Sequence, residues 1–175
     1  MRTSLIVAIV GEDKPGIVER VSNLVLAAGG NWEESRMARL SGKFAGILRL
    51  SVNSVNAEKL TLDLVGLEAL GLKIVVEPGT PTIDAGYETI GLELIGHDRP
   101  GIVRDISNLL AGRGVNIEEL ETELTSAPTS GDVLFRARAR LRTPRTVAPD
   151  ELRSLLESLA NDLMVDFTIE DGGAS

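Results

Sequence analysis

The sequence predicts an α+β chain built from two copies of one β-α-β-β-α-β unit, each with an antiparallel sheet and both helices on one face of it. Three observations lead to this prediction: an internal repeat, the same order of apolar patterns in both copies, and a proline- and glycine-containing segment between them. With 175 residues in the chain, each copy is large enough to bury a small hydrophobic core.

The repeat is clearest in the segment Gly11–Val18, which returns as Gly96–Val103. Residues 11–34 and 96–119 are identical at 13 of 24 positions without a gap. We therefore predict a first domain over residues 1–80 and a second over residues 87–171. The join falls near residues 77–86, where two prolines and two glycines interrupt both periodicities.

Each copy begins with a predicted strand that leads into a helix. Residues 5–10 form an apolar run of strand length, and residues 89–95 are their counterpart. Apolar side chains then recur at helical spacing, and glycines follow where each helix is expected to end. These apolar positions are Ile17, Val21, Leu24, Val25 and Ala28 in the first copy, and Ile102, Ile106, Leu109 and Leu110 in the second.

A hairpin, a second helix and a last strand complete each copy. The hairpin turns are predicted at residues 40–43 and, with a longer loop, at residues 125–132. Leucines at helical spacing follow over residues 60–67 and 152–163, and the last strands are expected at residues 72–76 and 164–169. This order is the ferredoxin-like arrangement, which leaves the second face of each sheet open.

The open faces are predicted to differ between the copies. In the second copy, glutamates on one hairpin strand and arginines on the other alternate with less polar residues. If Leu124 lies opposite Val133, the charged pairs are Glu121 with Arg136 and Glu119 with Arg138. In the first copy that face carries Ala45, Ile47, Arg49 and Ser51, and Ile47 suggests that it is covered.

Composition excludes several classes of function. A net charge of −8 disfavours direct contact with nucleic acid, and the absence of cysteine excludes thiolate metal sites. A single histidine excludes a histidine-rich metal centre, so we predict no metal, no cofactor and no catalytic residues. The apolar run near the N-terminus is too short for a membrane span, and we expect a cytoplasmic protein without membrane contact.

The repeated turn between the first strand and the first helix is the predicted ligand site. Its glycines allow a sharp bend, and the first-turn amides of the helix have no partner within the helix. A carboxylate suits these amides, while an aspartate in the turn can hold an ammonium group and a nearby asparagine can both donate and accept. These groups together match a free α-amino acid.

At these residues the chain resembles the ACT domain, and as a tandem pair it resembles the glycine cleavage system transcriptional repressor family. The resemblance implies amino-acid binding where the turn of one module faces a strand of a neighbouring module, and regulation through contact with another protein. Independently of the resemblance, exposed strand edges favour a homo-oligomer, and the lack of nucleotide-binding and nucleophile motifs favours a protein that is not an enzyme. The expected ligand residues are Gly11, Asp13, Pro15, Gly16, Ile17 and Asn31, and Gly96, His97, Asp98, Pro100, Gly101, Ile102 and Asn116.

Other interpretations stay open on the sequence alone. Asp13 and Asp98 can simply cap the helix start, and the glycines of the turn can serve the backbone conformation without touching a ligand. Asn31 and Asn116 can be turn residues. The whole protein can also be a regulatory subunit of a metabolic enzyme, or a structural oligomerisation module that binds no ligand.

Overall fold

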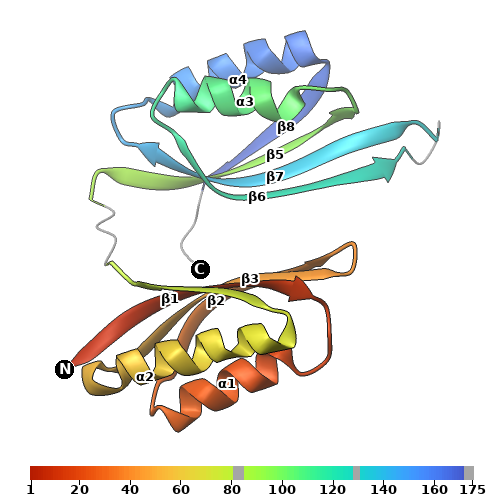
Figure 1. Cartoon of the computed structure of the whole chain (residues 1–175). Coiled ribbons are helices and arrows are strands. Elements are labelled where there is room, and N and C mark those ends of the chain that lie inside the picture. Colours follow the sequence, from red (N-terminus) through yellow and green to blue (C-terminus); the bar gives the residue numbers. More distant parts are fainter. Residues whose placement is uncertain (81–84, 128–130, 172–175) are drawn as a thin grey trace. The chain divides into compact units, whose positions relative to one another are not determined.

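The computed structural model describes residues 1–80, 85–127 and 131–171, and it divides the chain into two compact units, Met1–Thr82 and Ile83–Ser175 (Figure 1). The first unit contains β1 (Arg2–Glu12), α1 (Ile17–Ala27), β2 (Asn31–Leu40), β3 (Lys43–Asn53), α2 (Ser54–Val65), a short 3-10 helix η1 (Gly66–Leu70) and β4 (Lys73–Pro78). The second contains β5 (Tyr87–His97), α3 (Ile102–Ala111), β6 (Asn116–Ser126), β7 (Val133–Pro144), α4 (Pro149–Leu163) and β8 (Val165–Asp171).

Each unit has one four-stranded antiparallel sheet with both helices on the same face (Figure 1). The strand order is β2-β3-β1-β4 in the first unit and β6-β7-β5-β8 in the second, so the first strand of each unit lies in the middle. This confirms the predicted fold class. Within the described ranges, no helix is long and apolar enough to span a membrane.

The helix-covered face of each sheet forms the core. In β1, Leu5, Val7 and Ile9 are buried, because alternate residues of a strand point to the same face. The helices supply apolar side chains at helical spacing, such as Val21 and Val25 from α1. The second unit repeats this arrangement with Leu92, Leu94 and Ile106 among its core residues. Burial of each such side chain contributes about 1.5–3 kcal/mol.

The hairpin of the first unit turns where it was predicted, but the predicted register of the second hairpin is wrong. Leu124 lies opposite Phe135, and Glu121 and Glu119 lie opposite Arg138 and Arg140. The reason is that strand pairing continues past Leu124 to Ser126, which lies opposite Val133. Each glutamate therefore faces an arginine two residues further along than predicted, on the same face of the sheet.

The open faces of the two sheets differ as the sequence suggested. In the first unit Val10, Ile47 and Val75 are exposed by 47%, 50% and 55%. In the second unit the strand pairs place Glu93 opposite Arg138 and Glu123 opposite Arg136, so this face is largely ionic. The same fold therefore presents two chemically different surfaces.

Candidate functional site

The turn between β1 and α1 leaves the helix start without a side-chain cap. Gly16 occupies the N-cap position with φ +91°, a left-handed conformation that favours glycine, and Gly101 does the same before α3 with φ +94°. Neither helix start receives a hydrogen bond from a capping side chain. The first-turn amides of α1 and α3 are therefore donors that a ligand carboxylate fits.

Gly11 and Gly96 have a packing role that their sequence motif does not indicate. A Cβ atom added at Gly11 would meet Leu72 Cδ2 at 2.5 Å. One added at Gly96 would clash with Val165 Cγ1 and would meet the Val165 Cα at 2.9 Å. The absence of a side chain at these positions lets the start of the last strand approach the central strand, which accounts for glycine without a ligand.

A pocket of about 190 Å³ lies beside the first turn. Its lining residues are Glu12, Lys14, Pro15, Ile17, Arg20, Leu70 and Leu72. Pro15 and Ile17 were predicted site residues, and Ile17 is also a buried core residue. Lys14 and Arg20 were missed, although Arg20 follows Ile17 by three residues and so faces the same side of the helix. The two cations make this pocket suited to a carboxylate.

Asp13 does not cap the helix. Its carboxylate accepts from Arg39 Nε at 2.7 Å, and its amide donates to the Gly42 carbonyl at 3.0 Å. The aspartate therefore ties the turn to the β2–β3 hairpin. In the second unit Leu124 holds the position that corresponds to Arg39, and the described part of the chain offers the Asp98 carboxylate no ion pair.

Glu12 forms a second link between the turn and the hairpin. Lys43 Nζ donates to its carboxylate at 3.1 Å. This hydrogen bond, the charge of Lys43 and the charge of Lys14 lower the pKa of Glu12 below its ordinary value of 4.5. In the second unit the corresponding residues are His97 and Leu134, which lie opposite one another in β5 and β7. That turn lacks this ionic link.

The two turns also differ at the start of the helix. Where α1 carries Arg20, α3 carries Asp105. Asp105 is paired with Arg104 at 2.8 Å and with Arg99 at 3.9 Å, so the cations near the second turn are already compensated. Because Glu19 of α1 is replaced by Arg104 of α3, the two helix starts carry the same net charge in the opposite order, and the second turn has the more available aspartate.

The structure does not bring Asn31 and Asp13 together within one unit. The turn lies at the end of the sheet where Glu12 pairs with Lys43, whereas Asn31 pairs with Ser51 at the other end. The reason is α1, whose 11 residues carry the chain back along the sheet over about 16 Å. The same geometry separates Asn116 from Asp98. A site that uses both groups needs the turn of one module and the asparagine of another.

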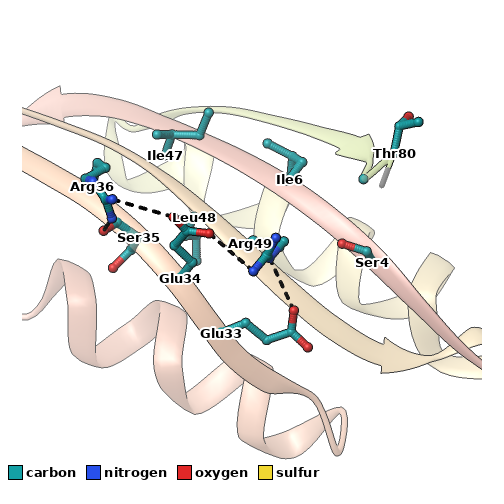
Figure 2. A pocket seen from close by; sticks show the side chains of 11 residues that line it. Ser4, Ile6, Glu33, Glu34, Ser35, Arg36, Ile47, Leu48, Arg49 and Thr80 are labelled. Atoms are coloured by element: carbon teal, nitrogen blue, oxygen red, sulfur yellow. Dashed lines mark hydrogen bonds and ion pairs between the residues drawn. The ribbon is translucent and has the colours of Figure 1, made fainter. Parts of the chain in front are cut away.

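A larger pocket of about 430 Å³ lies on the open face of the first sheet (Figure 2). It is lined by Ser4, Ile6, Glu33, Glu34, Ser35, Arg36, Ile47, Leu48, Arg49, Gly79 and Thr80. None of these was a predicted site residue. A β-bulge between Trp32 and Glu34 places two successive glutamates against Arg49, at 3.3 Å from Glu33 and 3.2 Å from Glu34.

Comparison with known proteins identifies the module. A family model of the ACT domain matches residues 3–77, nearly the whole of the first unit, and the second unit repeats its sequence motif and its fold. The first unit is thus an ACT domain, and it is followed by a second unit of the same fold.

Three similar proteins match over almost the whole chain. The glycine cleavage system transcriptional repressor of Escherichia coli is 26% identical over 94% of this chain and 88% of its own length. A crystal structure of an unknown protein from Galdieria sulphuraria is 31% identical, with a TM-score of 0.88 over 99% of this chain and 100% of that one. A further crystal structure, provisionally named as the same repressor, has a TM-score of 0.70 at 21% identity over 97% of each chain.

The chain thus carries two kinds of candidate site. One kind is the duplicated turn at the start of α1 and α3, which sequence motifs reveal. The other is the pocket on the open face of the first unit, for which the sequence offers one weak signal, the successive glutamates that follow Asn31. These glutamates recur as Glu118 and Glu119 in the second unit, where Arg140 contacts both at 3.5 and 2.8 Å.

Proposed function

We propose that this protein is a non-enzymatic regulator that binds a small free amino acid at its strand-to-helix turns and signals the bound state to a protein partner. The observation that carries the proposal is the duplicated, uncapped helix start behind Gly16 and Gly101. Two such sites in a family-typical position favour a retained binding role over a purely structural one.

The two turns recognise the ligand with different groups. At the first turn the ligand carboxylate lies against the α1 amides, near Lys14 and Arg20, because these cations line the pocket. At the second turn Asp98 receives the ligand ammonium, since its carboxylate is not held by an arginine at the position of Leu124. In each case Asn31 or Asn116 of a neighbouring module completes the site, which makes binding depend on assembly.

The partner is a protein, in our proposal a factor that controls transcription of amino-acid metabolism. The similarity to repressors of the glycine cleavage system supports this choice. The net charge of −8 argues against direct contact with a DNA backbone, so control of transcription needs an intermediary. Ligand binding shifts the partner equilibrium only if the two assembly states differ in affinity for the amino acid.

A thermal-shift panel of the twenty amino acids tests the ligand site. We expect at least one to raise the melting temperature, because a ligand that binds the native state stabilises it. Asp98→Ala should abolish the part of the shift that comes from the second turn, and Arg20→Met should weaken the part from the first. Asp162→Ala, an exposed aspartate on α4, is the matched control. A flat panel for the wild type would reject the proposal.

Affinity capture of partners, with and without the active amino acid, tests the second step. We expect one protein whose recovery changes with the ligand, and we expect Asp98→Ala to remove that change. Recovery of the same proteins in equal amounts under both conditions would contradict a sensing role, even if the amino acid binds.

A further inference from the structure

We propose that the open face of the first unit is an interface at which two copies of this chain pair through their first units. The helices α1 and α2 cover only one face of that sheet, and the other face carries half-exposed aliphatic side chains (Figure 1). The proposal goes beyond the proposed function, because it concerns a surface that shares no residue with the turns and it requires no amino acid.

The middle of this face is an apolar band that crosses three neighbouring strands. Ala8 of β1 lies opposite Ile47 of β3 on one side and opposite Val75 of β4 on the other. Ile47 and Val75 are 50% and 55% exposed, although both lie within the sheet. Val10 and Ile6 extend the band along β1, and Figure 2 shows Ile6 and Ile47 on neighbouring strands. Contact with a second apolar surface would remove this band from water.

The face is hollowed beside the apolar band. A depression of about 370 Å³ includes Ala38, Ala45 and Gly46 in its lining. Arg36 and Ile47 line both this depression and the pocket of about 430 Å³, so the two adjoin each other. Two stacked sheets lie about 10 Å apart, and the side chains of their inner faces interdigitate. The hollows can therefore receive side chains from a second sheet.

The charged side chains of this face balance each other. The three carboxylates between the strand pairs of Ser4 and Val10 face three cations, and the six residues are Glu33, Glu34, Glu77, Arg36, Arg49 and Lys73. Arg36 and Arg49 are already paired with the two glutamates of β2. Because this face is neutral, two copies of a chain with a net charge of −8 repel each other less here than at an acidic surface.

The strand register makes the face complementary in charge to itself. On the edge strand β4, Lys73 and Glu77 are exposed on either side of Val75, and within the described ranges neither is in an ion pair. A two-fold axis that crosses the strands at Val75 and Ala8 places Lys73 of one copy over Glu77 of the other, and the reverse. Sheets related by this axis keep their strands aligned, as in β-sandwiches. The pairing thus gains two intermolecular ion pairs around the apolar band.

At the opposite edge, the same axis places Arg36 over its own counterpart. Each Arg36 is accompanied by Glu34 at 3.6 Å, which compensates its charge. The twist between aligned sheets, about 30°, also moves these two edge residues apart along the strands. We therefore assign the specificity of pairing to β4, and we expect the β2 edge to contribute little.

The second unit does not fit the same role. The row that is apolar in the first unit is polar here, and it consists of Arg138, Glu93 and Thr168. The two flanking positions of the last strand are both acidic, Asp166 and Glu170, so the same axis would bring like charges together. Burial of such an ionic face against an apolar one would remove charges from water without giving them partners. The fitting partner for the first unit is therefore another first unit.

Sedimentation velocity of the full chain over a range of concentrations tests the interface. We expect a reversible dimer with a dissociation constant of roughly 1–100 µM, as for a weak interface. Ile47→Arg, which installs the residue of the second unit next to the two-fold axis, should abolish this association. Leu62→Arg, the same kind of change at a 67% exposed position on α2, is the matched control and should dimerise as the wild type does. A wild-type chain that stays monomeric at about 1 mM would overturn the proposal.

A charge exchange tests the two-fold arrangement. Lys73→Glu should weaken dimerisation at least about tenfold, because it places carboxylates over each other at two symmetric positions, and Glu77→Lys should have a similar effect. The double variant restores opposite charges across the axis and should recover the affinity of the wild type. Lys59→Glu on α2 changes the net charge equally and should leave dimerisation unchanged. A double variant as weak as the single variants would reject this arrangement.

Further outcomes distinguish this interface from others. Dimers that respond to the charge exchange but tolerate Ile47→Arg would indicate edge-to-edge pairing of β4 and would overturn stacking of the open faces. Dimers that Leu62→Arg abolishes would place the interface on the helices, with the same consequence. Circular dichroism checks that each variant is folded. The measurements contain no amino acid, so a flat amino-acid panel would reject sensing at the turns and leave this proposal standing.

Discussion

The two units of this protein agree where they are covered by helices and differ where they are open. Leu50 and Leu141 occupy corresponding core positions and are both fully buried. On the other face of the same strands, Ile47 in the first unit corresponds to Arg138 in the second. The difference teaches that close packing restricts substitution on the core face, while the open face of a duplicated module is able to acquire a new chemistry.

The turns differ in a comparable way. Both keep the glycine that the left-handed N-cap requires, but the first turn is tied to its hairpin by two ion pairs, Asp13 with Arg39 and Glu12 with Lys43. The second turn has Leu124 and Leu134 at the positions of these cations. Backbone geometry is thus shared, whereas the charges around it are specific to each unit.

The largest expected effect tests the similarity of the cores. Leu50→Ala and Leu141→Ala should each lower the free energy of unfolding of their unit by about 3–4 kcal/mol, because each leaves a cavity in a close-packed core. Hydrogen exchange of the amides in each unit measures the two effects separately. A loss below about 1 kcal/mol in one unit would mean that its core tolerates a cavity that the other does not.

The next largest effect concerns Gly11 and Gly96, which each lie against the start of the last strand of their unit. Alanine substitutions at the two positions are expected to lower stability by different amounts. Gly96→Ala should cost about 3 kcal/mol, because the new methyl group would meet the Val165 backbone. Gly11→Ala should cost about 1 kcal/mol, since its nearest neighbour is the far end of the Leu72 side chain and not a backbone atom. Denaturant unfolding compares them, with Gly66→Ala, where a Cβ meets nothing, as control. An equal loss of stability in Gly96→Ala and Gly11→Ala would contradict this prediction.

A third prediction concerns a buried hydroxyl that one unit has and the other lacks. Thr143 is 1% exposed, and its Oγ1 has no hydrogen-bond partner among the described residues, whereas the corresponding residue of the first unit is Val52. Thr143→Val should stabilise the protein by about 1 kcal/mol, and Val52→Thr should destabilise it by a similar amount. Thermal denaturation gives both values; a destabilising Thr143→Val would show that the hydroxyl is satisfied in solution.

The smallest effect concerns the ionic link of the first turn. Lys43→Met should raise the pKa of Glu12 towards 4.5, because the hydrogen bond and the charge of Lys43 are its main perturbations. A lowered pKa in the folded state means that this contact stabilises the fold above the ordinary pKa and is lost as pH falls through the folded value. NMR titration of the Glu12 carboxyl carbon measures the shift. An unchanged pKa of Glu12 in Lys43→Met would show that Lys43 does not cause the lowered pKa.

The fold was predictable because its signals are local and occur twice. The apolar run of β1 and the helical spacing of α1 each have a counterpart in β5 and α3, so that one copy supports the other. The hairpin register of β6 and β7 was not predictable, because glutamates alternate uniformly along β6 and arginines alternate uniformly along β7. A shift by two residues still places glutamates opposite arginines, so the charges alone do not fix the register. The register is fixed where the turn begins, at the pair Ser126 and Val133.

The candidate sites were predictable only in part. The motif around Gly16 marked the turn, and Pro15 and Ile17 do line its pocket. The separation of Asn31 from Asp13 was not foreseen, because residues that are near in the repeat are carried to opposite ends of the sheet by a helix. The pocket at Glu33 and Arg49 also needs Ser4 and Ile6 of β1, which is distant in sequence from the hairpin, and the successive glutamates are its one weak local signal.

By itself, the sequence determined the duplication, the order of strands and helices, and the bend that needs glycine at residues 16 and 101, because these follow from short-range periodicity and backbone sterics. The tertiary structure decided which charges meet: that Arg39 holds Asp13, that Arg49 lies between two glutamates, and that Val165 leaves no room for a side chain at residue 96. Such contacts depend on register and on the packing of distant strands, which arise only when the whole sheet has formed.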